Sequence, residues 1–162
     1  KVVGPLHKPD VEGVILNVRH NDVVAEEYDR MMSIPDATGV MIQPMLSGTE
    51  VFVGAIHEEN FGHVILCGLG GIFIEVLKDV AYGMSPLTLG EAEDMIKSLK
   101  SYKLIEGFRK KEGVNKEIYA DILVRLSALL EAAPEIKELD LNPLMGTQKY
   151  VIAVDGRIRI EK

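Results

Sequence analysis

Three apolar runs separated by short polar segments constrain the fold more than any other feature of this sequence. The runs are "GVMIQPM" (39–45), "EVFVGAIH" (50–57) and "FGHVILCG" (61–68), joined by "LSGT" and "EEN". Apolar and β-branched residues favour strands, whereas glycine, serine and asparagine in the connecting segments are typical of turns. The sequence therefore predicts a three-stranded meander over residues 39–68.

Two helices are expected after the meander. Thr88 and Glu91 have the T-x-x-E spacing of a capping box, which predicts a helix from 89 to about 100. A longer helix is predicted from Asn115 to about Leu130. Its expected apolar face consists of Ile118, Ile122, Leu126 and Leu129.

Secondary-structure elements are also predicted near both ends of the chain. Near the N-terminus, "VEGVILNV" (11–18) predicts a strand, and 21–33 predicts a helix capped by Asn21 or Asp22. Near the C-terminus, "ELDLNPLM" (138–145) and "YVIAVDGRIRI" (150–160) predict two strands around the turn "GTQK". This order of elements predicts a mixed α/β fold of the α+β kind.

Composition narrows the class of protein. The 162 residues are 47% hydrophobic, which suits one domain or two small lobes with a real core. A net charge of −7 argues against nucleic acid or an anionic membrane as the main partner. A single cysteine, Cys67, fits a reducing cytoplasm, and no apolar run is long enough to span a bilayer. We therefore expect a cytoplasmic protein. The chain opens without methionine inside an apolar run, so we also expect it to be a fragment of a longer protein.

The C-terminal hairpin carries the clearest chemical signal. In "ELDLNP" the period of two places Leu139 and Leu141 on one face and the polar residues on the other. Asp155 follows the apolar "VIAV" on the returning strand, so Asn142 and Asp155 can face the same point. Such oxygen donors suit Mg²⁺. An ordinary solvent face of an edge hairpin is the alternative.

Two glycine- and proline-marked segments admit both a structural and a functional interpretation. The cluster "CGLGG" (67–71) is neither a dinucleotide fingerprint nor a Walker A loop. Its backbone amides can approach an anion closely, or the glycines can form a tight turn or a bulge. Similarly, "MIQPMLSGTEVFVG" (41–54) predicts either a hairpin with an edge strand or a hinge between lobes. In the second case the hinge backbone would pair with a flat heterocycle while Glu50 reaches a ribose.

The segment "GPLHKPD" (4–10) raises the same choice for His7. Two prolines and a glycine keep the segment out of a helix or a central strand. His7 is therefore either a solvated loop residue or an imidazole held out for chemistry. The run "RKK" (109–111) is more typical of a solvated loop than of a binding patch.

Taken in order, several motifs resemble one known family. They are "KVVGPLHKPDVEGV", "VMIQPMLSGTEVFVG", "CGLGGIFIEVLKDV", "YKLIEGFR" and "ELDLNPL…AVDGRI", and they extend over essentially all 162 residues. The chain is similar to the ATP-grasp portion of ADP-forming acyl-CoA synthetases, the acetate–CoA ligase group related to succinyl-CoA synthetase. The resemblance implies two α/β lobes that grip a nucleotide. Here the remainder of the first lobe would cover about 1–42 and the second lobe about 43–162, with the fold truncated at its N-terminal side.

The resemblance also implies roles for individual residues. Lys1 would touch ATP phosphates, and His7 would carry phosphate between a partner domain and the nucleotide site. The glycine loop with Gly70 and Gly71 would also contact the nucleotide. The remaining implied contacts are Gln43 to Met45 at the adenine hinge, Glu50 at the ribose, and Asn142 and Asp155 as magnesium ligands.

The implied reaction is acyl-CoA + ADP + phosphate ⇌ carboxylate + CoA + ATP. It would need ATP or ADP, Mg²⁺, and CoA-binding and ligase domains or subunits, and we expect an oligomer. One departure stands out, because Gly83 in "DVAYGMSPL" replaces an arginine that is common in the family. The departure raises the alternative of a degenerate binding or regulatory module, as in protein acyltransferase fusions, unless Arg109 or Arg157 substitutes.

Overall fold

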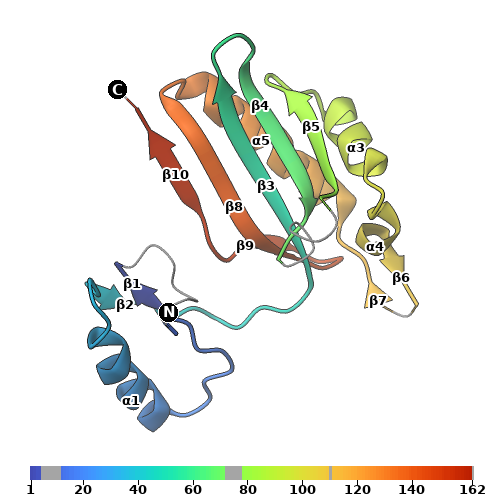
Figure 1. Ribbon diagram of the computed structural model, residues 1–162. Coiled ribbons are helices and arrows are strands. Elements are labelled where there is room, and N and C mark those ends of the chain that lie inside the picture. The colour runs from blue at the N-terminus through green and yellow to red at the C-terminus, as the bar shows by residue number, and fades with distance from the viewer. Residues whose placement is uncertain (5–11, 72–77, 110, 162) are drawn as a thin grey trace. The chain divides into compact units, whose positions relative to one another are not determined.

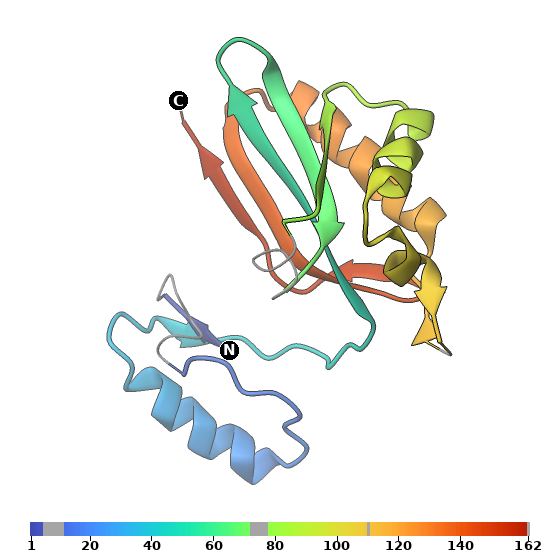
Figure 2. The ribbon, with the colours of Figure 1, turned by 45° about the vertical axis from the view of Figure 1, so that its right-hand side comes forward.

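The protein divides into two compact units, and each is described by itself. A computed structural model describes residues 1–4, 12–71, 78–109 and 111–161. Unit 1 is Lys1–Leu46 and unit 2 is Ser47–Lys162. The segment that carries His7 lies outside the described residues. Figures 1 and 2 show the elements of both units in two views.

Unit 1 combines one helix with a minimal sheet. Strands β1 (Val2–Val3) and β2 (Gly39–Val40) pair antiparallel, and α1 (Asn21–Met32) lies between them in sequence. The strand predicted over 11–18 is wrong for the described residues 12–18, which form no strand. Glu12 and Asn17 have φ angles of 52° and 59°, and such left-handed residues interrupt an extended ladder.

Two further expectations for unit 1 need correction. Helix α1 begins after His20, which is the N-cap in place of the expected Asn21 or Asp22 and makes no side-chain cap bond. The first arm of the meander is also wrong, because β2 pairs with β1 and residues 41–47 form no strand. Met41 N donates instead to Lys1 O at 2.7 Å, and Pro44 has no N–H for a ladder.

Unit 2 is built on an antiparallel sheet with the order β10-β8-β3-β4-β5, and β9 also pairs with β8 (Figure 1). The hairpin predicted from the second and third apolar runs is confirmed, with the partners running from Val51↔Leu69 to Glu58↔Gly62. The strands are β3 (Thr49–Glu58), β4 (Gly62–Leu69), β5 (Val80–Met84), β8 (Ile136–Gly146), β9 (Val151–Ala153) and β10 (Arg157–Ile160).

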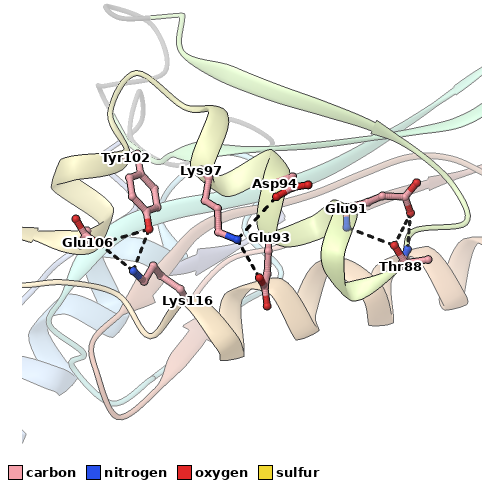
Figure 3. Close-up of polar contacts among 8 residues, drawn as sticks. All are labelled: Thr88, Glu91, Glu93, Asp94, Lys97, Tyr102, Glu106 and Lys116. Atoms are coloured by element: carbon pink, nitrogen blue, oxygen red, sulfur yellow. Dashed lines mark hydrogen bonds and ion pairs between the residues drawn. The ribbon is translucent and has the colours of Figure 1, made fainter.

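Helices α3 (Leu89–Ser98) and α5 (Lys116–Ala132) cover one face of this sheet (Figure 2). Both helices were predicted, and Thr88 and Glu91 form the expected capping box, drawn in Figure 3. The predicted face of α5 is partly wrong, because Leu129 is 44% exposed. The helix is turned so that it buries Tyr119, Ala120, Leu123, Leu126, Ser127 and Leu130.

Tyr119 gives the physical reason for this orientation of α5. Its buried hydroxyl lies 2.7 Å from Phe52 O and 3.1 Å from Gly68 O, and it accepts from Gly68 N at 3.2 Å. These partners lie on β3 and β4, so the hydroxyl links two neighbouring strands. A buried hydroxyl without partners is costly, and the partners therefore fix the rotation of the helix.

A short segment between α3 and α5 forms one edge of unit 2. It contains α4 (Tyr102–Glu106), β6 (Gly107–Phe108) and β7 (Lys111–Glu112), with β6 and β7 paired antiparallel. Lys116 Nζ lies 3.0 Å from Glu106 Oε1 and 2.9 Å from the Tyr102 hydroxyl, which ties α4 to the start of α5 (Figure 3).

The observed architecture agrees with the expected mixed α/β class. Helices pack on antiparallel strands, and the core of unit 2 lies between the sheet and α3 and α5. None of the helices in the described ranges combines the length and apolar character needed to cross a membrane.

Candidate functional site

The polar residues of the C-terminal hairpin lie at an irregularity of β8. Val51 pairs with Leu144 and Val53 with Leu141, so β8 has an extra residue at Asn142–Pro143, which is a β-bulge. On the other edge of β8, β9 and β10 pair with separate stretches. Asn142 and Pro143 are therefore flanked by irregular pairing on both sides.

Asp155 lies in the gap between β9 and β10. Ala153 pairs with Leu144, and Val154 N donates to Pro143 O at 3.0 Å, so the next residue, Asp155, comes alongside Asn142. Pro143 has no N–H to continue the ladder, which explains why the edge strand is interrupted there. Two of the predicted residues are thus brought together at one point of the sheet edge.

Asp140 adds a third oxygen-bearing side chain to this region. Partial burial raises the pKa of its carboxyl, and the negative charges of Glu138 and Asp155 raise it further, while Arg157 opposes them. A divalent cation beside Asn142 and Asp155 would relieve this repulsion. The donor set of amide and carboxylate oxygens therefore fits Mg²⁺, which commonly uses one or two carboxylates with water and phosphate oxygens.

The described residues offer little support for other metals or for a thiol nucleophile. Within the described ranges, no group of three or more histidine, cysteine, aspartate or glutamate residues is placed to hold a metal ion. Burial, the largest influence, raises the pKa of the Cys67 thiol to about 12, so the thiolate is scarce at neutral pH. Cys67 is therefore a core residue.

Unit 2 contains a cavity of about 980 Å³. Its walls come from residues 47–50 before and in β3, Leu69 and Gly71 at the end of β4, the α4–β7 segment, and the turn after β8. Of the residues expected to contact a nucleotide, Glu50 and Gly71 line this cavity. Gly70 lies next to it, since Gly70 N donates to Glu50 O at 2.8 Å.

The backbone conformation of Gly71 explains why glycine is favoured there, and Gly71 also lies close to the Glu50 carboxylate. Gly71 has a φ of 60°, and an added Cβ would collide with Glu50 Oε2. A Cβ on Gly70 would lie 2.9 Å from Val51 O. Both glycines therefore let the chain after β4 pass close to β3, and this proximity places the Glu50 carboxylate in the cavity wall.

The α4–β7 segment and the turn after β8 also line the cavity. Leu104, Phe108 and Arg109 line it, together with Glu112 and Thr147. Their contribution depends on the fold of α4, β6 and β7, because they lie far from Glu50 in the sequence. The sequence signals for this segment are the resembling motif "YKLIEGFR" and Arg109 as a candidate substitute for the arginine missing at Gly83, although "RKK" by itself is more typical of a solvated loop.

Unit 1 contains a smaller cavity of about 140 Å³. Lys1, Gln43 and Met45 line it, beside α1 and β2. The residues expected at the phosphates and the adenine hinge therefore gather within unit 1. Glu50, Gly70, Gly71, Asn142 and Asp155 belong to unit 2.

Gly83 occupies a packed position on β5. An added Cβ would lie 2.5 Å from Met95 Sδ and 2.9 Å from Leu87 Cδ2. The space beside Gly83 is thus filled by α3 and the segment before it. Gly83 belongs to neither of the two cavity walls.

Comparison with known proteins places these features in a family. The ATP-grasp domain family matches residues 1–160. The acetate–CoA ligase (ADP-forming) I β subunit of Pyrococcus furiosus is 40% identical over 168 residues, which cover 98% of this chain and 72% of that subunit. Acetate–CoA ligase (ADP-forming) II of Archaeoglobus fulgidus is 47% identical over 154 residues, or 94% of this chain and only 23% of that ligase.

A solved structure agrees with the sequence relatives. The dinucleotide-forming acetyl-coenzyme A synthetase 1 of Candidatus Korarchaeum cryptofilum has a TM-score of 0.86 and 36% identity, covering 99% of this chain and 75% of that one. That protein was solved with coenzyme A and Mg-AMPPCP, with its phosphohistidine segment pointing towards the nucleotide-binding site. The agreement in sequence and in fold confirms the resemblance, and the chain belongs to the ATP-grasp domain family, to which the matching parts of ADP-forming acetate–CoA ligases are related.

Proposed function

We propose that this chain is the nucleotide-binding, phosphoryl-transferring part of an ADP-forming acyl-CoA synthetase. The whole enzyme would interconvert acyl-CoA, ADP and phosphate with carboxylate, CoA and ATP. The observation that carries the proposal is the irregularity of β8, where Asn142 and Asp155 come together beside Asp140. Bulges of this kind are common next to active sites because they redirect side chains.

In this proposal Asn142 and Asp155 hold Mg²⁺. When bound, the ion would neutralise charge on the phosphate oxygens, which is the main requirement of phosphoryl transfer. Burial is the main reason that the pKa of Asp140 is raised, and the negative charges of Glu138 and Asp155 raise it further. These neighbouring carboxylates support the assignment, because a cation would offset their charge.

Each unit contains residues for which we propose a nucleotide contact. Lys1 would contact phosphate oxygens, while Gln43 and Met45 form the adenine hinge. Glu50 would accept hydrogen bonds from the ribose hydroxyls, and Gly70 and Gly71 would allow close approach to the ligand. The shared cavity walls of Glu50 with Gly71, and of Lys1 with Gln43 and Met45, support these groupings.

His7 would be the phosphate carrier. In the sequence, His7 is flanked by Gly4, Pro5 and Pro9, residues that disfavour a helix or a central strand. The phosphohistidine segment described for the Korarchaeum relative supports this role, since the two chains align over 99% of this one.

The proposal extends to organisation and partners. We place the remainder of the first lobe at about 1–42 and the second lobe at about 43–162. CoA-binding and ligase domains, on the same polypeptide or on another subunit of an oligomer, would supply acyl phosphate chemistry. The β-subunit status of the Pyrococcus relative supports such a partner. The single cysteine supports the cytoplasm as the place of action.

A second candidate is a degenerate ATP-grasp module with a binding or regulatory role. Gly83 favours it, because the arginine that is common in the family is absent at this position. The two candidates differ in whether phosphate is transferred through His7.

The metal assignment is tested with Asp155→Asn in the full-length protein. Calorimetry should show weaker binding of Mg-ADP and nearly unchanged binding of ADP measured with chelator, because only the metal contact is lost. Asp94→Asn is the matched control, since the Asp94 side chain on α3 is 83% exposed. Equal affinity of Asp155→Asn and wild type for Mg-ADP would contradict the assignment.

The phosphate relay is tested with His7→Ala. The variant should bind Mg-ATP almost normally and lose net synthesis of ATP from acyl-CoA, ADP and phosphate. Wild type incubated with γ-phosphate-labelled ATP should retain acid-labile, base-stable label on His7. Nucleotide binding without any such label and without turnover would favour the regulatory module.

A further inference from the structure

The large cavity of unit 2 has an unusual balance of charge. Two carboxylates, Glu50 and Glu112, line it, and Arg109 is the basic side chain among its described lining residues. A cavity with two carboxylates repels phosphate unless a cation offsets them. Arg109 is placed to provide that offset.

The backbone holds Arg109 at this position. Arg109 lies between β6 and β7 and has a φ of 47°, a left-handed conformation that is unfavourable for residues other than glycine. Val114 N donates to Ile105 O at 2.7 Å and closes the base of the segment. The fold therefore maintains a strained arginine at the cavity, and such strain often marks functional positions.

The guanidinium of Arg109 is oriented by an aromatic ring. Its Cζ lies 5.2 Å from the centroid of the Phe108 ring. Stacking on a ring face leaves the N–H groups at the edge of the guanidinium plane available as donors. Phe108 also lines the cavity, so this stacked pair forms part of its wall.

Three other arginines have acidic partners that Arg109 lacks among the described residues. Arg30, Arg125 and Arg159 each form ion pairs with nearby carboxylates. Among the residues that the structure describes, none forms an ion pair with Arg109. The guanidinium of Arg109 is stacked on a ring at the cavity wall and has no ion-pair partner among the described residues. Such a group is suited to bind a phosphate from solution.

We propose that Arg109 binds a phosphate group of the nucleotide at the cavity of unit 2. This inference rests on the proposed nucleotide-binding function and adds a positively charged contact to it. Within one cavity, the Glu50 carboxylate would then accept hydrogen bonds from hydroxyl groups, and the Arg109 guanidinium would donate hydrogen bonds to phosphate.

The test compares ligands with and without phosphate in the full-length protein. Calorimetry is carried out with Mg-ADP, adenosine and coenzyme A on wild type, Arg109→Ala and Arg109→Lys. Arg109→Ala should bind Mg-ADP about tenfold to a hundredfold more weakly, the usual range for a lost charge-assisted hydrogen bond. Adenosine binding should not change, and Arg109→Lys should recover part of the affinity for Mg-ADP. Arg125→Ala, whose guanidinium is paired on the surface of α5, should match wild type.

Several outcomes would overturn the inference. Unchanged Mg-ADP affinity in Arg109→Ala excludes a phosphate contact. Equal losses for Mg-ADP and adenosine indicate that the residue only shapes the cavity with Phe108. Loss confined to coenzyme A assigns Arg109 to that ligand's phosphates instead. Failure of wild type itself to bind Mg-ADP would refute the proposed function along with the inference, whereas the first three outcomes leave that function standing.

Discussion

The two units of this chain contain similar kinds of residues but bury them very differently. In unit 2 the sheet and two helices enclose a continuous core that includes Tyr119, Leu123 and Leu144. In unit 1 Val2 and Met31 are buried, while Leu16 and Ile42 are 63% and 75% exposed. Burial of apolar area is the dominant favourable contribution to folding. Unit 2 therefore provides its own stability, whereas unit 1 contributes little from its own described contacts.

This contrast should be largest in amide hydrogen exchange of the 162-residue chain. Amides of β3 and β4 lie in a central, doubly paired part of the sheet and should open only with global unfolding. Amides of β1 and β2 form a two-residue ladder and should exchange at least about a thousandfold faster. Measurement by NMR or mass spectrometry resolves the two groups. Similar protection in both units would show that unit 1 has a stability of its own.

A cavity in the core of unit 2 should have the next largest effect. Leu123→Ala removes a fully buried side chain on α5, and we expect the free energy of unfolding to fall by roughly 2–5 kcal/mol. Leu129→Ala on the same helix is the control, because Leu129 is 44% exposed and should cost far less. Chemical denaturation measures both. Equal losses would show that Leu123 and Leu129 are buried to the same extent in solution.

Removing the Tyr119 hydroxyl should have an intermediate effect. Tyr119→Phe deletes the hydrogen bonds to Phe52 and Gly68 and leaves the ring packed. We expect the free energy of unfolding to fall by roughly 1–2 kcal/mol, because the carbonyl oxygens of Phe52 and Gly68 lose a hydrogen-bond partner that water cannot replace in the core. Denaturation of the variant next to wild type gives the value. Tyr82→Phe, on a 63% exposed side chain, should be nearly neutral and controls for loss of a hydroxyl in general.

The smallest effect should depend on pH and concerns Asp79. Burial tends to raise the pKa of this carboxyl, but hydrogen bonds from Ser101 and Lys100 outweigh it and lower the pKa below 3.8. The stabilisation is therefore complete above about pH 4 and is lost as pH falls through the lowered pKa. Asp79→Asn should reduce stability by roughly 1 kcal/mol at pH 7, and the difference should shrink below pH 4. A difference that is constant with pH would contradict this account.

Local signals accounted for several elements of the fold. The capping box at Thr88 and Glu91 defined the start of α3, and Asn115 defined the start of α5, because caps act within a few residues. The β3–β4 hairpin followed from two apolar runs and a short turn. The apolar pattern of 11–18 predicted a strand that the described residues do not form. Composition does not reveal the left-handed φ angles of Glu12 and Asn17, which interrupt an extended ladder.

For the candidate functional residues, the sequence indicated their identity, whereas their arrangement in space depends on the fold. Residue type, spacing and motif order identified Glu50, Gly71, Asn142 and Asp155 as candidates, because all three are properties of the sequence. The bulge that aligns Asn142 with the gap holding Asp155 is different, because it depends on pairing with both β3 and β9.

Residue type and local spacing thus determined the secondary-structure signals, the family resemblance and the oxygen-rich hairpin. The tertiary structure alone decided which face of α5 is buried, where β8 bulges, and that Phe108 and Arg109 share a cavity with Glu50. Each of these depends on contacts between segments far apart in the chain. Their energies come from burial and hydrogen bonding that no local sequence pattern contains.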